Sequence, residues 1–249
     1  MLNVALFFSK LWVTNVLIDG ENEGVGVIVQ DFDPKEAFAR VNGQRLHEAF
    51  LEHHVLCLRG GSLSHESFLR LSRYFGEPKI QLLSDYHLDE CPEISVISNY
   101  NNIGRGKPHV RATHWHTDDS YFARPAKATA LYAQALPGAG GDTAFIDCHA
   151  VLDAMPASLR HLIEGRKAVH KYLSRRSKAV VAERNDAEIK ETPDVSHPLI
   201  RIHPDTGRRA LYINPNRIDH IEGIPIDESD TILDEIYAFA FETRFQFRH

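Results

Sequence analysis

Cysteine is scarce in this chain of 249 residues, which contains only Cys57, Cys91 and Cys148. A disulfide framework and a structural zinc site both need paired, closely spaced thiols. The wide spacing of these three cysteines excludes both kinds of site. Free thiols are typical of a reducing compartment, so the sequence predicts a cytoplasmic protein.

An excess of positive charge is also absent, because the formal net charge is −6 and the sequence pI is about 6.2. Nucleic acids and anionic lipids attract proteins through a strong basic field, which this chain lacks as a whole. The composition therefore favours a small-molecule partner and argues against nucleic acid and membrane. It leaves a homo-oligomer open.

No apolar run is long enough for a membrane helix. The longest candidate, residues 2–18, is interrupted by Lys10 before it reaches the roughly 20 residues that a span needs. No positive cluster precedes this run and no small-residue cleavage site follows it, which argues against an export signal.

Repeats, low-complexity tracts and Gly/Ser linkers are missing as well, so residues 1–249 are predicted to form a single domain. The N-terminal part of the sequence is expected to contain both helices and strands. A β-branched strand is expected at residues 25–29, followed by a helix at 34–52 whose capping box joins Asp33 and Glu36. A strand at residues 55–58 and a second helix, capped by Ser64 and ending before Pro78, are expected next.

Short β-type runs dominate the rest of the chain. The turn Pro204-Asp205-Thr206-Gly207 predicts a hairpin between two of them. Helices are expected near residues 150–164, in the polar stretch 176–190, and after a cap at Asp227. The expected strands are residues 94–97, 128–135, 143–146, 199–202, 210–213 and 245–247. This order indicates a mixed α+β, mainly β fold of the sandwich or barrel type, and parallel α/β winding does not fit.

The motif His-x-Asp/Glu can supply an imidazole and a carboxylate to one metal ion from a single stretch of backbone. With 15 histidines and 34 acidic residues, about two such motifs are expected by chance. The chain has four, so context has to choose among them. They begin at His87, His116, His203 and His220.

Three of the four motifs have a simpler interpretation. His203 and Asp205 lie in the predicted hairpin turn, where a solvated turn is the better explanation. His220 is expected in a loop before the last helix. His87 and Tyr86 could together face a substrate pocket, although a surface loop is favoured for His87.

The fourth motif carries a family resemblance. The stretch Trp115-His116-Thr117-Asp118, with Pro137-Gly138 and Gly140-Gly141-Asp142-Thr143, resembles the core of the taurine/phenoxyacetate (TauD/TfdA) dioxygenases. Thr143 follows His116 by 27 residues, which agrees with that family. Later stretches, His197-Pro198-Leu199-Ile200-Arg201 and Leu211-Tyr212-Ile213-Asn214, are similar to its second half.

The resemblance implies a double-stranded β-helix, or jelly roll, with flanking helices. It implies that His116 and Asp118 bind Fe(II) and that Thr143 binds the co-substrate 2-oxoglutarate. The implied reaction is oxidative decarboxylation of 2-oxoglutarate to succinate and CO₂, with O₂ hydroxylating a small organic substrate. Trp115 is a further candidate for the wall of the substrate pocket.

The chain departs from the family at its end, because the distal histidine and the arginine that binds 2-oxoglutarate are not in the sequence. The resemblance places them roughly one to two dozen residues beyond His249. We therefore expect a C-terminally incomplete dioxygenase domain. The alternative is a catalytically inactive member that serves as a binding scaffold, and a second rival is a metal-dependent isomerase or hydrolase on a cupin-type barrel.

Overall fold

The computed structural model describes residues 25–34, 38, 40–98, 114–179 and 181–248. The chain divides into two compact units. The first unit contains the chain up to Lys79, residues 127–145 and the end of the chain from Phe247. The second contains residues 80–126 and 146–246.

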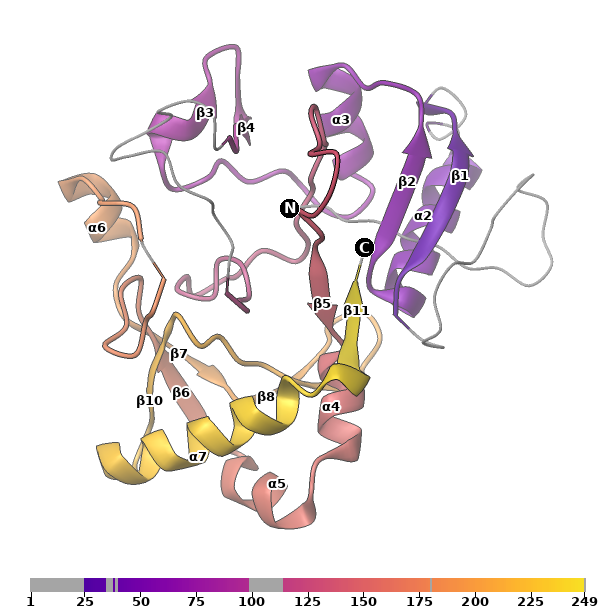
Figure 1. Ribbon diagram of the computed structural model, residues 1–249. Coiled ribbons are helices and arrows are strands. Elements are labelled where there is room, and N and C mark those ends of the chain that lie inside the picture. Colours follow the sequence, from indigo (N-terminus) through magenta and orange to yellow (C-terminus); the bar gives the residue numbers. More distant parts are fainter. Residues whose placement is uncertain (1–24, 35–37, 39, 99–113, 180, 249) are drawn as a thin grey trace. The chain divides into compact units, whose positions relative to one another are not determined.

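The first unit is built on two parallel strands, β1 (Val27–Phe32) and β2 (Leu56–Gly60), in which Val27 pairs with Leu56. Helix α2 (Arg40–His53) connects them and lies beside the pair (Figure 1). Both strand predictions are confirmed, as is the helix from Arg40 onward, whereas Glu36 of the predicted capping box lies outside the described residues. The sequence was not expected to form parallel α/β structure, and the parallel pair β1–β2 departs from that expectation in this part of the chain.

Helix α3 (His65–Ser72) begins as predicted, since the Ser64 hydroxyl accepts a hydrogen bond of 3.1 Å from the backbone N–H of Ser67. This bond satisfies one of the free donors of the first turn. The apolar side of the helix packs against the core of the first unit. That core contains Val27, Val29, Phe32, Leu46, Ala49, Val55, Leu56, Leu71, Phe75 and Phe247.

The predicted strand at residues 128–135 is wrong, because this segment forms no strand in the structure. Side chains hold it instead: Leu63 N–H donates to the Tyr132 hydroxyl (3.0 Å), and the Tyr132 ring lies 5.9 Å from that of Phe68. The run is rich in alanine. Its apolar residues contact the core of the first unit, but their backbone does not pair with a strand. The next strand is confirmed as β5 (Ala144–Ile146), which pairs with β11 (Gln246–Arg248).

The second unit contains a three-stranded antiparallel sheet in the order β10 (Ile218–Ile221), β6 (Lys167–His170) and β7 (Val195–Pro198). None of these strands was predicted. Each has four residues and carries polar or histidine side chains, so neither alternation nor an apolar run stands out.

Two hairpins complete the strands of this unit. The predicted hairpin is confirmed as β8 (Ile200–Ile202) paired with β9 (Arg209–Leu211). The strand expected at residues 94–97 is shifted to β4 (Cys91–Ser95), which pairs with β3 (His87–Leu88) after the short 3-10 helix η1 (Ser84–Tyr86).

Helices pack around the sheet. The predicted helix near residues 150–164 is two helices, α4 (Cys148–Ala154) and α5 (Ala157–Ile163), separated where Pro156 lacks a backbone donor. The polar stretch holds only α6 (Asp186–Glu191). The last helix is confirmed as α7 (Ile226–Ala240), although Pro225 and not Asp227 occupies its cap position. After it come the 3-10 helix η2 (Thr243–Phe245) and β11, so the strand expected at 245–247 begins one residue later.

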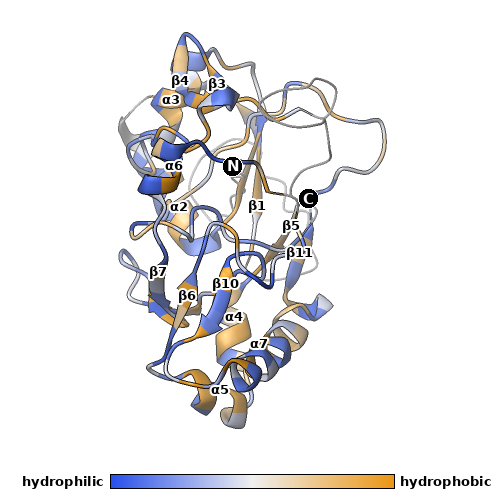
Figure 2. Cartoon of the chain, turned by 90° about the vertical axis from the view of Figure 1, so that its left-hand side faces the viewer, coloured by the Kyte–Doolittle hydropathy of each residue, from blue (hydrophilic) through white to orange (hydrophobic). Residues whose placement is uncertain are grey.

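Helix α7 places its apolar face on the core of the second unit. Leu233, Ile236 and Ala240 are fully buried on this face. In Figure 2, apolar and polar residues alternate along α7, as expected for a helix with one buried face, whereas α4 is largely apolar. The core also contains Val151, Leu152, Ile163, Ala168, Leu199, Leu211, Ile218 and Ile221.

We predict that Leu233→Ala lowers the free energy of unfolding by about 2–5 kcal/mol, because it leaves a cavity in a fully buried position. Glu235→Ala on the exposed face of the same helix should change it by less than about 0.5 kcal/mol. Urea denaturation of both variants tests this. Equal midpoints would show that α7 does not pack as described.

Candidate metal centre

His116 and Asp118 lie in the second unit on an irregular segment that turns at residues 118–121. Their side chains converge, and His116 Nε2 lies 3.2 Å from Asp118 Oδ1. The sequence motif suggested a strand or its end, but no strand is present at these positions and the turn brings the two groups together. Asp119, the next residue, has the left-handed backbone angle φ 56°, which aspartate tolerates better than most residues.

The separation of the two atoms suits a metal ion. Two donor atoms that lie about 2.1 Å from one ion at a right angle are about 3 Å apart. The side chains are 31% and 38% exposed, so an ion can reach them. His116 and Asp118 therefore fit two adjacent positions of an octahedral site.

The second ring nitrogen of His116 supports this assignment. Nδ1 lies 2.8 Å from the backbone carbonyl of His114, an acceptor, so Nδ1 carries the proton of that hydrogen bond. In the neutral ring this leaves the lone pair on Nε2, which faces Asp118. Metal-binding histidines are commonly fixed in this way by a carbonyl or carboxylate on the other nitrogen.

Without a metal, the carboxylate of Asp118 favours a proton on Nε2. Accordingly, the hydrogen bond to Asp118 raises the pKa of His116 above its ordinary value, against the opposing effects of partial burial and of the positive charge on Arg217. The pair thus favours a positive charge between its atoms. A metal ion can replace that proton.

Trp115 lies next to the pair and is half-buried. Its ring stacks on Phe241 at 5.8 Å with 29° between the planes, and Phe241 in turn stacks on Tyr237 at 5.7 Å. This stack anchors the start of the segment on residues at and beyond the end of α7. Whether Trp115 also lines a substrate pocket stays a prediction.

Thr143 belongs to the first unit and directly precedes β5. The turn before it depends on Gly140 and Gly141, which adopt the left-handed angles φ 73° and 83°. A Cβ on Gly141 would also approach the Pro137 ring to 2.9 Å. These two glycines therefore explain the motif Gly-Gly-Asp-Thr as a turn, and the role of Thr143 toward 2-oxoglutarate stays a prediction.

The other substrate-pocket candidates lie elsewhere in the second unit. Tyr86 ends η1 and is buried, with 5% of the residue exposed. His87 opens the β3–β4 hairpin, and its Nε2 lies 2.7 Å from the Gln81 carbonyl. Their role in a pocket stays a prediction.

The two remaining motifs have structural roles. His203 Nδ1 accepts hydrogen bonds of 3.3 Å from the N–H groups of Asp205 and Thr206, so it stabilises the hairpin turn as expected. His220 is on strand β10 and not in a loop, which corrects the sequence interpretation. Its Nδ1 is 3.0 Å from Asp219 Oδ2.

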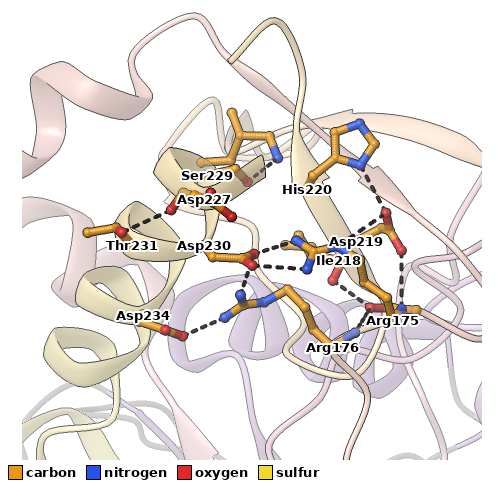
Figure 3. A network of polar contacts seen from close by, with 12 residues as sticks. Arg175, Arg176, Ile218, Asp219, His220, Asp227, Ser229, Asp230, Thr231 and Asp234 are labelled. Atoms are coloured by element: carbon orange, nitrogen blue, oxygen red, sulfur yellow. Dashed lines mark hydrogen bonds and ion pairs between the residues drawn. The ribbon is translucent and has the colours of Figure 1, made fainter. Parts of the chain in front are cut away.

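Asp219 joins His220 to a network of charges (Figure 3). It accepts a hydrogen bond of 3.1 Å from the backbone N–H of Arg175, whose guanidinium also binds Asp230 at 2.9 Å. Arg176 pairs with Asp230 and Asp234 on α7. This network ties residues 175–176, which follow β6, to β10 and α7, so His220 belongs to a structural cluster.

Sequence reasoning missed Arg217, whose side chain is partly buried. It donates a hydrogen bond to the Tyr172 carbonyl, and its guanidinium lies 4.9 Å and 4.8 Å from the ring centres of Tyr121 and Tyr172. Burial lowers its pKa, while Tyr121, Tyr172 and Asp118 oppose that effect. No local motif marks this arginine, because its neighbours come from distant parts of the sequence.

Among the described residues, no group of three or more His, Cys, Asp and Glu side chains is arranged to hold a metal ion. The part of the chain that the structure describes also has no helix long and apolar enough to cross a membrane.

Comparison with known proteins identifies the class. The sequence model for "Taurine catabolism dioxygenase TauD, TfdA family" matches residues 22–249. The chain is 29% identical to the alpha-ketoglutarate-dependent 2,4-dichlorophenoxyacetate dioxygenase of Cupriavidus pinatubonensis, over 89% of this chain and 80% of that protein.

Solved structures of similar fold include dioxygenases of the same kind. A putative alpha-ketoglutarate-dependent taurine dioxygenase from Burkholderia xenovorans matches with a TM-score of 0.73 at 23% identity, covering 94% of this chain and 78% of that one. AAD-2, crystallised with Mn(II) and N-oxalylglycine, matches with a TM-score of 0.69 at 20% identity, covering 94% and 82%. The second of these structures was thus solved with a divalent metal.

The fold and the family match define a non-haem iron dioxygenase. The chain belongs to the TauD/TfdA family. At the level of reaction type it is a 2-oxoglutarate-dependent dioxygenase, with Fe(II) as metal and 2-oxoglutarate as co-substrate. The expectations of family, activity and cofactors are confirmed.

We predict that Asp118→Asn lowers the pKa of His116 in the metal-free protein, because the hydrogen bond to the carboxylate is the main cause of its elevation. Since the folded-state pKa is raised, the pair stabilises the fold below the ordinary histidine pKa, and this contribution is lost as pH rises through the raised value. Imidazole NMR signals measured against pH test the pKa, and urea denaturation at several pH values tests the stability. An unchanged His116 pKa in Asp118→Asn would show that the pair does not interact in solution.

Proposed function

We propose that His116 Nε2 and Asp118 Oδ1 are two of the ligands that hold Fe(II) in this chain. The observation that carries the proposal is their 3.2 Å separation, together with the hydrogen bond that fixes the His116 ring through Nδ1. Neutral imidazole and carboxylate are suitable ligands for this ion, and the facial arrangement of two histidines and one carboxylate leaves open positions.

We further propose that residues 1–249 form a single dioxygenase domain built on a double-stranded β-helix with flanking helices. The structural relatives and the hairpin β8–β9 support this architecture.

Thr143 is proposed to donate its hydroxyl proton to a carboxylate of 2-oxoglutarate. Thr143 is half-buried, follows Gly141 by two residues, and carries a hydroxyl donor that can rotate toward a ligand. When bound, iron supplies the oxidative decarboxylation of 2-oxoglutarate to succinate and CO₂ and the hydroxylation of a small organic substrate by O₂.

The chain's own residues perform the positioning. His116 and Asp118 would hold the ion from one side, and stacking on Phe241 fixes the ring of the neighbouring Trp115. The positive charge of Arg217 opposes protonation of His116. The substrate is proposed to be a small organic molecule, as the names of the curated relatives describe for those proteins.

We predict that His116→Ala and Asp118→Ala each weaken Mn(II) binding by about tenfold or more, because each removes a direct ligand. His87→Ala is the matched control, since His87 belongs to another His-x-Asp motif and contacts a backbone carbonyl. Free Mn(II) can be followed by electron paramagnetic resonance during an anaerobic titration. If His87→Ala weakens binding and His116→Ala does not, the metal assignment is wrong.

A second prediction concerns the co-substrate. Fe(II) and 2-oxoglutarate together should give a visible charge-transfer band under anaerobic conditions, and His116→Ala should abolish it. Thr143→Val should raise the 2-oxoglutarate concentration needed for half of the band by about tenfold, the effect of one hydrogen bond to a charged group. Thr231→Val on α7 is the control. A band unaffected by Thr143→Val would remove Thr143 from the binding site.

A further inference from the structure

The segment that carries His116 and Asp118 has no regular secondary structure of its own. An irregular segment has no ladder of backbone hydrogen bonds, so its shape depends on contacts with other parts of the chain. In this protein those contacts come mainly from residues 213–216, which lie between β9 and β10.

Asn214 makes the central contacts. Its side chain is fully buried, and its Nδ2 donates hydrogen bonds to the Thr117 carbonyl (2.7 Å) and to the Ser120 hydroxyl (2.9 Å). Its Oδ1 accepts a bond of 3.1 Å from the backbone N–H of Asn216. One carboxamide therefore reaches the backbone between the two proposed ligands and a side chain just beyond them.

Two neighbouring contacts extend this arrangement. The Thr117 hydroxyl donates to the Ile213 carbonyl at 2.9 Å, and Asn216 Nδ2 donates to the Trp115 carbonyl at 3.4 Å. Ser120 is fully buried as well. Residues 115, 117 and 120 are thus each bound from the same four-residue stretch.

The stretch that binds them is itself fixed. The Asn214 carbonyl accepts hydrogen bonds from the N–H groups of Arg217 (3.1 Å) and Ile218 (2.9 Å), which form the turn into β10. Ile218 is fully buried in the core of the second unit. Asn214 therefore connects the metal-carrying segment to the sheet.

We propose that Asn214 is a positioning residue that sets the separation of the His116 and Asp118 side chains. This inference rests on the proposed function, because it takes these two residues as metal ligands. Asn214 needs both its donor and its acceptor atoms: the amide nitrogen holds the segment, and the amide oxygen holds its own turn. Aspartate has the same shape but lacks the two donors.

The test is Mn(II) affinity, measured with Mn(II) alone on the full chain under conditions where each variant is folded. Asn214→Asp should weaken binding about tenfold to a hundredfold, as is usual for residues that orient metal ligands. Thr117→Val, which removes the reciprocal bond, should weaken it in the same direction. Ser229→Ala is the matched control, because Ser229 is fully buried and accepts a bond from Ile221 N–H without contacting residues 115–120.

Trp115 provides a spectroscopic signature of the same effect. Trp12 and Trp115 are the two tryptophans of the sequence, so Trp12→Phe leaves Trp115 as the reporter. In this background, Asn214→Asp should increase quenching of Trp115 fluorescence by acrylamide, whereas Ser229→Ala should not. A residue that only stabilises the fold would make the two variants behave alike.

The outcomes separate the two proposals. If His116→Ala leaves Mn(II) affinity unchanged, the metal assignment itself is wrong. If His116→Ala abolishes binding while Asn214→Asp and Thr117→Val bind like the unchanged protein, the metal assignment stands and the positioning role is overturned. If Ser229→Ala weakens binding as much as Asn214→Asp at equal folded fraction, the effect is one of stability and the positioning role is likewise overturned.

Discussion

An imidazole nitrogen and a carboxylate oxygen 3.2 Å apart favour a proton or a metal cation between them. In the metal-free chain the Asp118 carboxylate favours the protonated ring and so raises the pKa of His116, and a divalent cation takes the place of that proton in the proposed holoenzyme. The ring orientation imposed by the His114 carbonyl makes Nε2 available for either. The chemistry proposed for this protein depends on keeping that separation in a segment without regular secondary structure.

The second unit supplies the required rigidity through buried polar contacts. Asn214 and Ser120 are fully buried and hydrogen-bonded to each other, which is the condition under which buried polar groups stabilise a structure. The charged network of Arg175, Asp219 and Asp230 works at a different place, where it joins β10 to α7. None of these ion pairs contacts residues 115–120, so the amide contacts of Asn214 and Asn216 are the ones that place the pair.

The sequence predicted those features whose geometry is set by residues close together in the chain. The Ser64 cap, the β8–β9 hairpin and the pairing of His116 with Asp118 all join residues within about a dozen positions of each other, where spacing along the chain decides the geometry. The sheet β10-β6-β7 was missed because its short strands become β only through pairing. Asn214 was missed as a positioning residue because its partners Thr117 and Ser120 are 97 and 94 positions away. The alanine-rich run at 128–135 shows the reverse error, in which burial against a core imitates strand character.

The most direct test of the account is the position of a bound divalent metal in a crystal of this protein soaked with Mn(II), located by anomalous scattering. We expect one peak about 2.1 Å from both His116 Nε2 and Asp118 Oδ1, the bonding distance for such ligands. A peak bound to neither residue, for instance one beside His87 and Asp89 or beside His220, would contradict the central claim.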